Sequence, residues 1–268
     1  MQALLRAGAL ECLVRPQDGM LVTALRRGDA DYLAERPGSW TGCPLLHPWA
    51  NRLSAERFSV RGRSVDASGA QRDQNGVVLH GLDSARRGWI VEHADETSLR
   101  ARRSWDDDAF PFPHEVAVEH RLTTRGLETT TDVLGDTPAA FGWHPFLRLP
   151  GVRRDRWRVT LGSRRRLVLD DRLLPTGASE PWAPLPFELA DRDFDEALAE
   201  IEGTFVLEAE GRRVEVEFIE GAPYGQFFAP RAEPVACFEP MAAPTNSLVT
   251  GDALPWAPWR MRFEIRIA

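Results

Sequence analysis

The strongest constraint on the fold is a strict alternation of apolar and charged side chains along two segments of the chain. Residues Trp259–Ile267 read Trp-Arg-Met-Arg-Phe-Glu-Ile-Arg-Ile, and Val214–Phe218 alternates in the same way. Successive side chains of a β-strand point to opposite faces of a sheet, so this period of two indicates a strand with one buried and one wet face. Both segments are therefore expected to be strands of a sheet whose outer face is solvated.

Further strand signals fill most of the chain. Two hairpins are predicted, Thr204–Glu208 turning at Glu210-Gly211 into Val214–Phe218, and Glu115–Leu122 turning at Arg125-Gly126 into Leu127–Leu134. Shorter strands are predicted at Glu11–Arg15, Met20–Leu25, Trp89–His93, Ser98–Ser104, Trp157–Leu161 and Leu167–Leu169. The loops between them hold many of the 20 prolines and 21 glycines. This pattern predicts an all-β sandwich or barrel and disfavours a parallel α/β sheet.

One segment has a helical period instead. In Asp193–Glu202, Phe194, Ala197, Leu198 and Ile201 recur at i, i+3, i+4 and i+7. Asp193 and Glu196 also have the spacing of an N-cap acid and its N3 partner. A short helix is predicted here. The chain has no internal repeat or evident boundary, so residues 1–268 are predicted to form a single domain.

Composition excludes several classes of function. All 33 basic residues are arginine. Without lysine, the chain cannot build a P-loop, a kinase ATP site or a Schiff-base site, although a biased genome explains the absence equally well. The net charge of −7 disfavours nonspecific nucleic-acid binding. No apolar run reaches the roughly 18 residues of a membrane span, and no signal peptide is evident, so a cytoplasmic protein is expected. The three cysteines (Cys12, Cys43 and Cys237) are expected to be reduced and mostly buried.

Four segments place costly polar side chains among apolar and aromatic ones. They span residues 44–53, with His47 and Arg52, residues 77–82, with His80, residues 141–147, with His144, and residues 235–246, with Glu239. A buried histidine or glutamate costs free energy unless it is hydrogen-bonded, so each needs a partner or a chemical role.

These segments resemble the aldose 1-epimerase, or galactose mutarotase, family. The resemblance rests on Pro48-Trp49-Ala50-Asn51-Arg52, Leu79-His80-Gly81, Gly142-Trp143-His144-Pro145-Phe146 and Phe238-Glu239-Pro240-Met241, and it spans the chain from about Leu10 onward. The resemblance implies a large antiparallel β-sandwich of the galactose mutarotase type, with one or two short helices. It also implies interconversion of the α and β anomers of a hexose such as galactose or glucose, with no cofactor and no metal.

The resemblance also implies roles for five residues. Glu239 is expected to be the general base and His144 the general acid of ring opening and reclosure. Arg52, His80 and Asp195 are expected to bind sugar hydroxyls. A carboxylate and imidazoles suit this chemistry because their pKa values can be tuned toward neutrality. Purely structural roles remain open for three of these residues. Glu239 could accept hydrogen bonds from loop amides, and Arg52 could be a surface ion-pair partner. Asp195 could stabilise the start of a helix, and Asp193 and Glu196 compete with it for the binding role.

Other residues are weaker candidates. Trp49, Trp89 and Trp143 could stack on a sugar or pack in the core, and Gln226 could line the site. His47 could face the cleft or the surface. His93, His114 and His120 show no metal-ligand spacing and are expected to be surface or core residues.

Three alternative functions remain open. A hexose-6-phosphate epimerase is one, because Arg86-Arg87 follows the His80 motif. A non-catalytic carbohydrate-binding sandwich is another, and a glycosidase with a second carboxylate is the third. The expected partner is a small sugar, with no nucleic acid and no membrane, in a monomer or homodimer.

Overall fold

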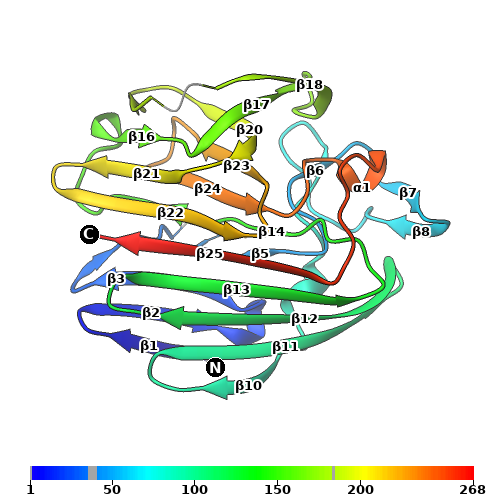
Figure 1. Cartoon of the computed structure of the whole chain (residues 1–268), viewed down its shortest axis with the longest axis horizontal. Coiled ribbons are helices and arrows are strands. Elements are labelled where there is room, and N and C mark those ends of the chain that lie inside the picture. Colours follow the sequence, from blue (N-terminus) through cyan, green and yellow to red (C-terminus); the bar gives the residue numbers. More distant parts are fainter. Residues whose placement is uncertain (1, 36–40, 183–184) are drawn as a thin grey trace.

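The computed structural model describes residues 2–35, 41–182 and 185–268, and β-strands dominate it (Figure 1). The largest sheet has nine strands, and every neighbouring pair is antiparallel. In spatial order these are β10 (Ile90–Ala94), β11 (Ser98–Asp107), β12 (Phe110–Leu122), β13 (Gly126–Gly135), β25 (Trp259–Ile267), β22 (Arg212–Glu220), β21 (Thr204–Ala209), β16 (Arg158–Thr160) and β19 (Phe187–Glu188). We call this the large sheet.

A second sheet of eight strands packs against the large sheet. Its order is β18 (Pro175–Pro181), β17 (Ser163–Leu169), β20 (Phe194–Ile201), β23 (Tyr224–Ala229), β24 (Ala236–Met241), β14 (Gly142–Trp143) and β5 (Leu45–Leu46), while β15 (Phe146–Leu147) also pairs with β24. We call this the site sheet, because the candidate site lies on it. The two-layer arrangement confirms the predicted all-β, antiparallel sandwich.

Smaller elements complete the fold. A four-stranded sheet contains β1 (Ala3–Ala7), β2 (Leu10–Arg15), β3 (Leu21–Arg27) and β4 (Ala30–Asp31). Two-stranded ladders join β6 (Arg52–Leu53) to β9 (Val78–Leu79) and β7 (Arg57–Val60) to β8 (Arg63–Asp66). The described residues include one α-helix, α1 (Ser247–Thr250), and three 3-10 turns at Pro16–Asp18, Asp83–Arg86 and Arg154–Arg156. None of the helices in these described parts is long and apolar enough to cross a membrane.

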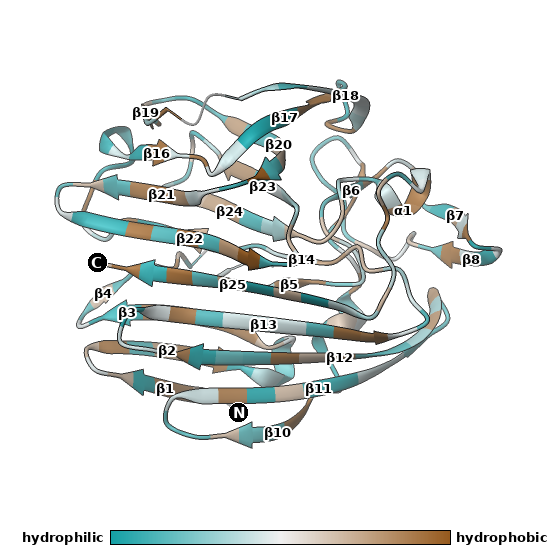
Figure 2. Ribbon diagram, in the orientation of Figure 1, coloured by the Kyte–Doolittle hydropathy of each residue, from teal (hydrophilic) through white to brown (hydrophobic). Residues whose placement is uncertain are grey.

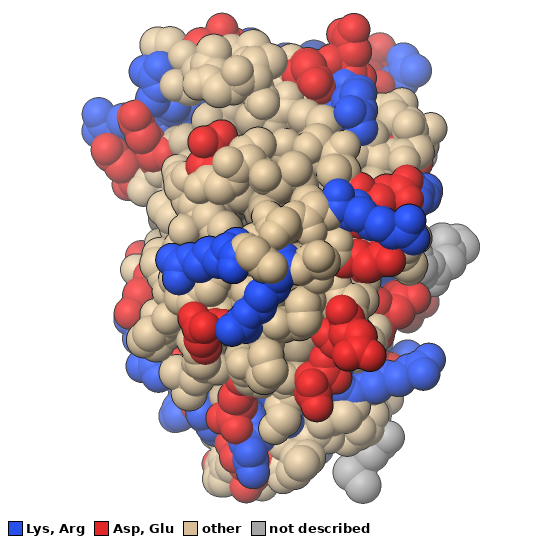
Figure 3. Space-filling view, turned by 90° about the vertical axis from the view of Figure 1, so that its right-hand side faces the viewer, with Lys and Arg blue, Asp and Glu red and all other residues tan. Residues whose placement is uncertain are grey.

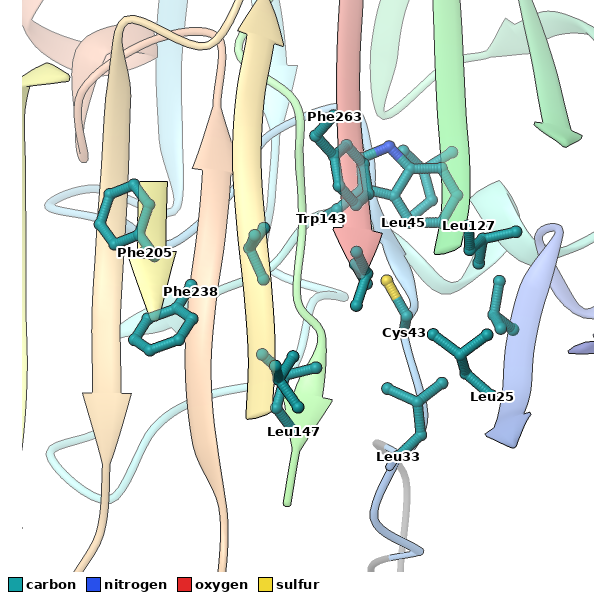
Figure 4. Packing of buried hydrophobic residues seen from close by; sticks show 14 of the residues in the cluster. Leu25, Leu33, Cys43, Leu45, Leu127, Trp143, Leu147, Phe205, Phe238 and Phe263 are labelled. Atoms are coloured by element: carbon teal, nitrogen blue, oxygen red, sulfur yellow. The ribbon is translucent and has the colours of Figure 1, made fainter. Parts of the chain in front are cut away.

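The main core lies between the large sheet and the site sheet. Phe205 on β21 faces Phe238 on β24, with ring centroids 5.4 Å apart, and Trp143 on β14 lies beside Phe263 on β25 (Figure 4). The buried indole N–H of Trp143 donates to Thr131 Oγ1 at 3.0 Å. Apolar contacts of this kind supply most of the stabilisation of a β-sandwich.

The outer face of the large sheet is charged, as the alternation predicts. Along β25 the residues alternate between hydrophobic and hydrophilic (Figure 2). Arg266 donates to Glu215 at 3.0 Å and to Glu264 at 2.7 Å, and Arg260 binds Asp132 at 2.6 Å. At the end of the molecule that carries β7, β8 and α1, acidic and basic groups are likewise interspersed (Figure 3).

The predicted helix over Asp193–Glu202 is wrong. This segment is strand β20, which pairs with β17 on one side and β23 on the other. Three consecutive residues, Ala197–Ala199, are buried, because the strand is covered on both faces. A strand that is covered in this way loses its period of two, and its apolar residues can match a helical spacing by chance. Interstrand pairing decides the structure here.

Candidate functional site

A cavity of about 280 Å³ opens on the face of the site sheet that points away from the main core. It is lined by Asn51, Arg52, Gln71, Asp73, Gln74, Leu79, His80, His144, Phe146, Asp195, Gln226, Phe228 and Glu239. The five site residues predicted from the sequence are all in this set. Two come from the cyan segment that contains β6, and the others come from the site sheet and its connections (Figure 1).

Strand register explains why three of the polar side chains meet. Gln226 on β23 lies opposite Glu239 on β24, and Phe228 lies opposite Asp195 on β20. Residues that are directly opposite, or two apart on one strand, point to the same face of a sheet. Asp195, Gln226 and Glu239 therefore share the cavity face, while the intervening Phe227 points to the core.

Glu239 is buried, with 1% of its surface exposed. Its Oε1 lies 3.2 Å from His144 Nε2, while no hydrogen-bond partner among the described residues reaches Oε2. Burial raises the pKa of Glu239 well above its ordinary value, the charge of Asp195 raises it further, and Arg52 opposes this shift. A carboxyl with a raised pKa is a stronger base and is better matched to proton transfer near neutral pH.

His144 follows β14 and is held in a tight aromatic setting. Its ring stacks on Phe146 with centroids 4.1 Å apart, and its amide donates to Pro44 O at 3.1 Å. The ring of His80 meets it edge-on at 5.2 Å. The two imidazoles and the Glu239 carboxylate thus form a compact group at one end of the cavity.

The tautomer of His80 follows from its neighbour Asn51. The amide of Asn51 donates to His80 Nδ1 at 3.2 Å, and the amide of His80 donates back to Asn51 O at 3.0 Å. Burial lowers the pKa of His80 well below its ordinary value, as do His144 and Arg52. The ring is therefore neutral near pH 7, and since Nδ1 accepts, Nε2 carries the proton. His80 can act as a hydrogen-bond donor in the cavity.

Arg52 is held between two carboxylates. Its Nε donates to Asp73 Oδ2 at 2.7 Å, and its Nη2 donates to Asp195 Oδ2 at 2.9 Å. Gln226 Nε2 donates to the other oxygen of Asp195. Of the competing acids in this segment, Glu196 pairs with Arg166 and Asp193 accepts from the amide of Arg231, so Asp195 alone of the three lines the cavity.

Comparison with known proteins identifies the family of the chain. A model of the aldose 1-epimerase family matches residues 8–259. The chain belongs to this family. It is therefore an isomerase of the class that acts on carbohydrates. No curated protein sequence matches the chain.

Several solved structures share the fold of this family member. They include a putative aldose 1-epimerase from Escherichia coli K12 (22% identity, TM-score 0.81, covering 100% of this chain and 99% of that chain). A galactose mutarotase-like protein from Clostridium acetobutylicum is 19% identical, with a TM-score of 0.83 over 99% of this chain and 94% of that one. Galactose 1-epimerase from Lactobacillus acidophilus NCFM is 13% identical, with a TM-score of 0.77 over 99% and 93%. The predicted galactose mutarotase type of sandwich is confirmed.

His47 lies neither in the cavity nor on the surface, so both sequence-based placements were wrong. It is 3% exposed, and its Nε2 lies 2.8 Å from Nε2 of His114 on β12. Its carbonyl lies under Gly81, where a Cβ atom would come within 2.2 Å of the oxygen. Gly81 also has a φ of +76°, which favours glycine. This close approach fixes the turn that carries His80.

The other tryptophan, histidine and arginine candidates lie outside the cavity lining. Trp49, Trp89 and Trp143 are buried in the core and do not line the cavity, and the same holds for His120. His93 is exposed and lies 2.9 Å from Asp95, and Arg86 and Arg87 lie outside the cavity lining. Among the described residues, no group of three or more histidines, cysteines or acids could hold a metal ion.

Sequence reasoning missed several lining residues. Phe146 and Asn51 lie within the motifs that contain His144 and Arg52, so the sequence could have placed both of them near the site. Asp73, Gln71 and Gln74 lie in a polar loop with no pattern of its own, and only the folded structure brings this loop against Arg52.

Proposed function

We propose that this protein is an aldose 1-epimerase that interconverts the α and β anomers of a free, uncharged hexose such as galactose or glucose. The observation that carries the proposal is the contact of the buried Glu239 carboxylate with the His144 imidazole inside a cavity lined by hydrogen-bonding groups. Such a pair can act as base and acid on two oxygens of one small substrate.

The reaction needs only proton transfers. Glu239 removes the proton of the anomeric hydroxyl, the bond between C1 and the ring oxygen breaks, and His144 gives a proton to that oxygen. The open aldehyde then turns about its C1–C2 bond. On reclosure, His144 takes back the hydroxyl proton, and Glu239 returns its proton to the carbonyl oxygen. Each group ends in the state in which it began, so no cofactor takes part.

The polar lining favours a neutral substrate. Arg52 is the one arginine among the described residues of the lining, and Asp73 and Asp195 both bind it. A phosphorylated hexose would need a free cation, and Arg86 and Arg87 lie elsewhere. The volume is near the lower end of the ~300–1,000 Å³ typical of small-molecule sites, which suits a monosaccharide.

Polarimetry tests the proposal directly. The protein is expected to speed the change in optical rotation of freshly dissolved α-galactose or α-glucose, with no added metal. Glu239→Gln and His144→Asn are expected to remove this rate enhancement in folded protein. A panel of free aldoses whose rotation changes no faster than in buffer would refute the enzyme, and sugar binding by calorimetry without turnover would instead indicate a non-catalytic sandwich.

A further inference from the structure

Asp73 stands behind Arg52 on the side away from Asp195. The side chains of Arg52 and Asp73 are only 9% and 6% exposed, and their contact is the shorter of the two ion pairs that Arg52 makes. Arg52 Nη1 also lies 3.3 Å from Asn51 Oδ1. The guanidinium is thus fixed on three sides before any substrate binds.

The same carboxylate shapes the loop that forms one wall of the cavity. Asp73 Oδ1 accepts from the amides of Asn75 and Val77, each at 2.9 Å. The amide of Asp73 in turn donates to Val77 O at 2.9 Å. One oxygen of Asp73 therefore organises the turn, which leaves Oδ2 pointing at Arg52. Asp73 holds this position through its own loop and independently of a ligand.

The pairing changes what Arg52 can offer to a ligand. A guanidinium has five N–H donors, and among the described residues Asp73, Asp195 and Asn51 take three of them. Two donors remain for a substrate, but the positive charge already faces two carboxylates. In a buried setting such charges interact strongly, so the group behaves as an oriented hydrogen-bond donor rather than as a free cation.

We propose that Asp73 is a specificity-determining residue, which cancels the charge of Arg52 from behind and makes the cavity select uncharged sugars over sugar phosphates and sugar acids. This inference rests on the proposed function and deepens it. Asp195 faces the cavity and can meet substrate hydroxyls, whereas Asp73 acts through Arg52. Arg52, Asp73 and Asp195 together carry one net negative charge, so removing the Asp73 charge should make the group neutral and lessen its repulsion of anions. It should also release the Nε–H of Arg52.

The test uses two variants and a matched control. Asp73→Asn keeps the size of the side chain. Its NH2 group must then face either Arg52 or the loop amides, which are hydrogen-bond donors themselves. Asp73→Ser removes the charge and keeps a hydroxyl that can accept from the same turn. Glu56→Gln removes a carboxylate that pairs with Arg72, next to Asp73 in the chain, at 2.9 Å on the exposed side of the loop. Thermal unfolding confirms that each variant is folded, and Asp73→Ser carries the test if Asp73→Asn is not.

The measured quantity is the selectivity between charged and uncharged sugars. If Asp73 had only a structural role, its loss would not shift this selectivity toward anions. Inhibition of free-hexose mutarotation by hexose 6-phosphate and by hexuronate is expected to be weak in the wild type and in Glu56→Gln. In both Asp73 variants the ratio of the phosphate Ki to the free-hexose KM should fall about tenfold or more, because a like charge has been removed. An unchanged ratio in folded variants would overturn the proposal.

Failure of the proposed function gives a different result. If the wild type accelerates no mutarotation, the epimerase assignment is lost, and calorimetric titration with hexose 6-phosphate still compares the affinity of wild type and variants for anions. Tighter phosphate binding by Asp73→Ser than by the wild type supports the role of Asp73 in that case. Equal binding rejects it.

Discussion

Glu239 Oε1 and His144 Nε2 lie 3.2 Å apart, and their side chains are 2% and 7% exposed. The carboxylate is thus removed from water with one histidine at its side and with its second oxygen unpartnered among the described residues. Such an arrangement favours reactivity over stability, because a buried carboxylate is stabilised only as far as its partners replace water.

Glu239→Gln should therefore lose activity and gain stability. Mutarotation is expected to slow by about 10²–10⁴-fold, the usual contribution of a general acid or base. The folded state raises the pKa of Glu239 well above the ordinary value, so the ionised carboxyl destabilises the fold at pH 7, and this penalty vanishes as pH falls below the unfolded value. Calorimetric Tm values should exceed those of the wild type at pH 7 and converge with them near pH 4. A variant that is less stable at pH 7 would contradict the raised pKa.

His80→Asn tests the donor role assigned to the second imidazole. His80 has a φ of +59°, a conformation that asparagine tolerates better than most residues, so the turn should survive. The loss of one Nε2–H hydrogen bond, worth about 0.5–1.5 kcal/mol, should raise the KM for free hexose by roughly two- to tenfold, with a smaller effect on kcat. Initial-rate polarimetry separates the two parameters. A large fall in kcat at constant KM would instead assign His80 to proton transfer.

The strands could be predicted where one face is exposed to solvent and the other is buried, because apolar and polar residues then alternate. The strand Trp259–Ile267 has the bounds that the alternation indicates, and the Thr204–Glu208 hairpin turns at Glu210 and Gly211, both with positive φ. The segment Phe194–Ile201 could not be assigned in this way, because both faces are covered at Ala197–Ala199 and the apolar spacing no longer follows the strand period. Its partners on β17 and β23 are distant in sequence, and they decide its structure.

The site residues could likewise be predicted only where the local sequence has an unusual pattern. The motifs around His80, His144 and Glu239 stood out because each puts a polar group among apolar neighbours. Asp73 lies in a wholly polar stretch, and its role depends on its contact with Arg52, which is 21 residues away in the sequence. His47 depends on His114, 67 residues away, so its burial was equally invisible in the local sequence.

Gly81→Ala should disrupt the His80 turn far more than a glycine change in an open turn. An added Cβ would lie 2.2 Å from His47 O, and the positive φ adds strain. Gly62, in the β7–β8 hairpin, has a φ of +80°, but a Cβ added there would meet nothing within 4 Å, so Gly62→Ala measures the backbone strain alone. That strain is about 1–2 kcal/mol, and the overpacking at Gly81 should add roughly 1–3 kcal/mol. Urea unfolding of the two variants provides the comparison, and equal losses would show that the His47 carbonyl can move aside.

His120 should make the fold sensitive to acid at a site remote from the cavity. It is fully buried on β12, where Nε2 donates to Met20 O and Nδ1 accepts from Thr129 Oγ1, each at 2.9 Å. Burial lowers the pKa of His120 from 6.5 to about 4, against the opposing effects of the Met20 hydrogen bond and the charge of Glu119. The unfolded chain therefore takes up a proton below pH 6.5, whereas the folded protein does not until about pH 4.

The free energy of unfolding should consequently fall as pH drops from 6.5 toward 4, by up to about 3 kcal/mol from His120 alone. Glutamine can still donate to a carbonyl but does not titrate, so His120→Gln should be less stable than the wild type at pH 7.5 and should lose less on acidification. Urea unfolding at pH 7.5 and pH 4.5 measures both differences. His114, whose pKa burial also lowers to about 4, remains in the variant and should leave part of the acid sensitivity in place. Equal losses in the two proteins would show that His120 keeps an ordinary pKa in the fold.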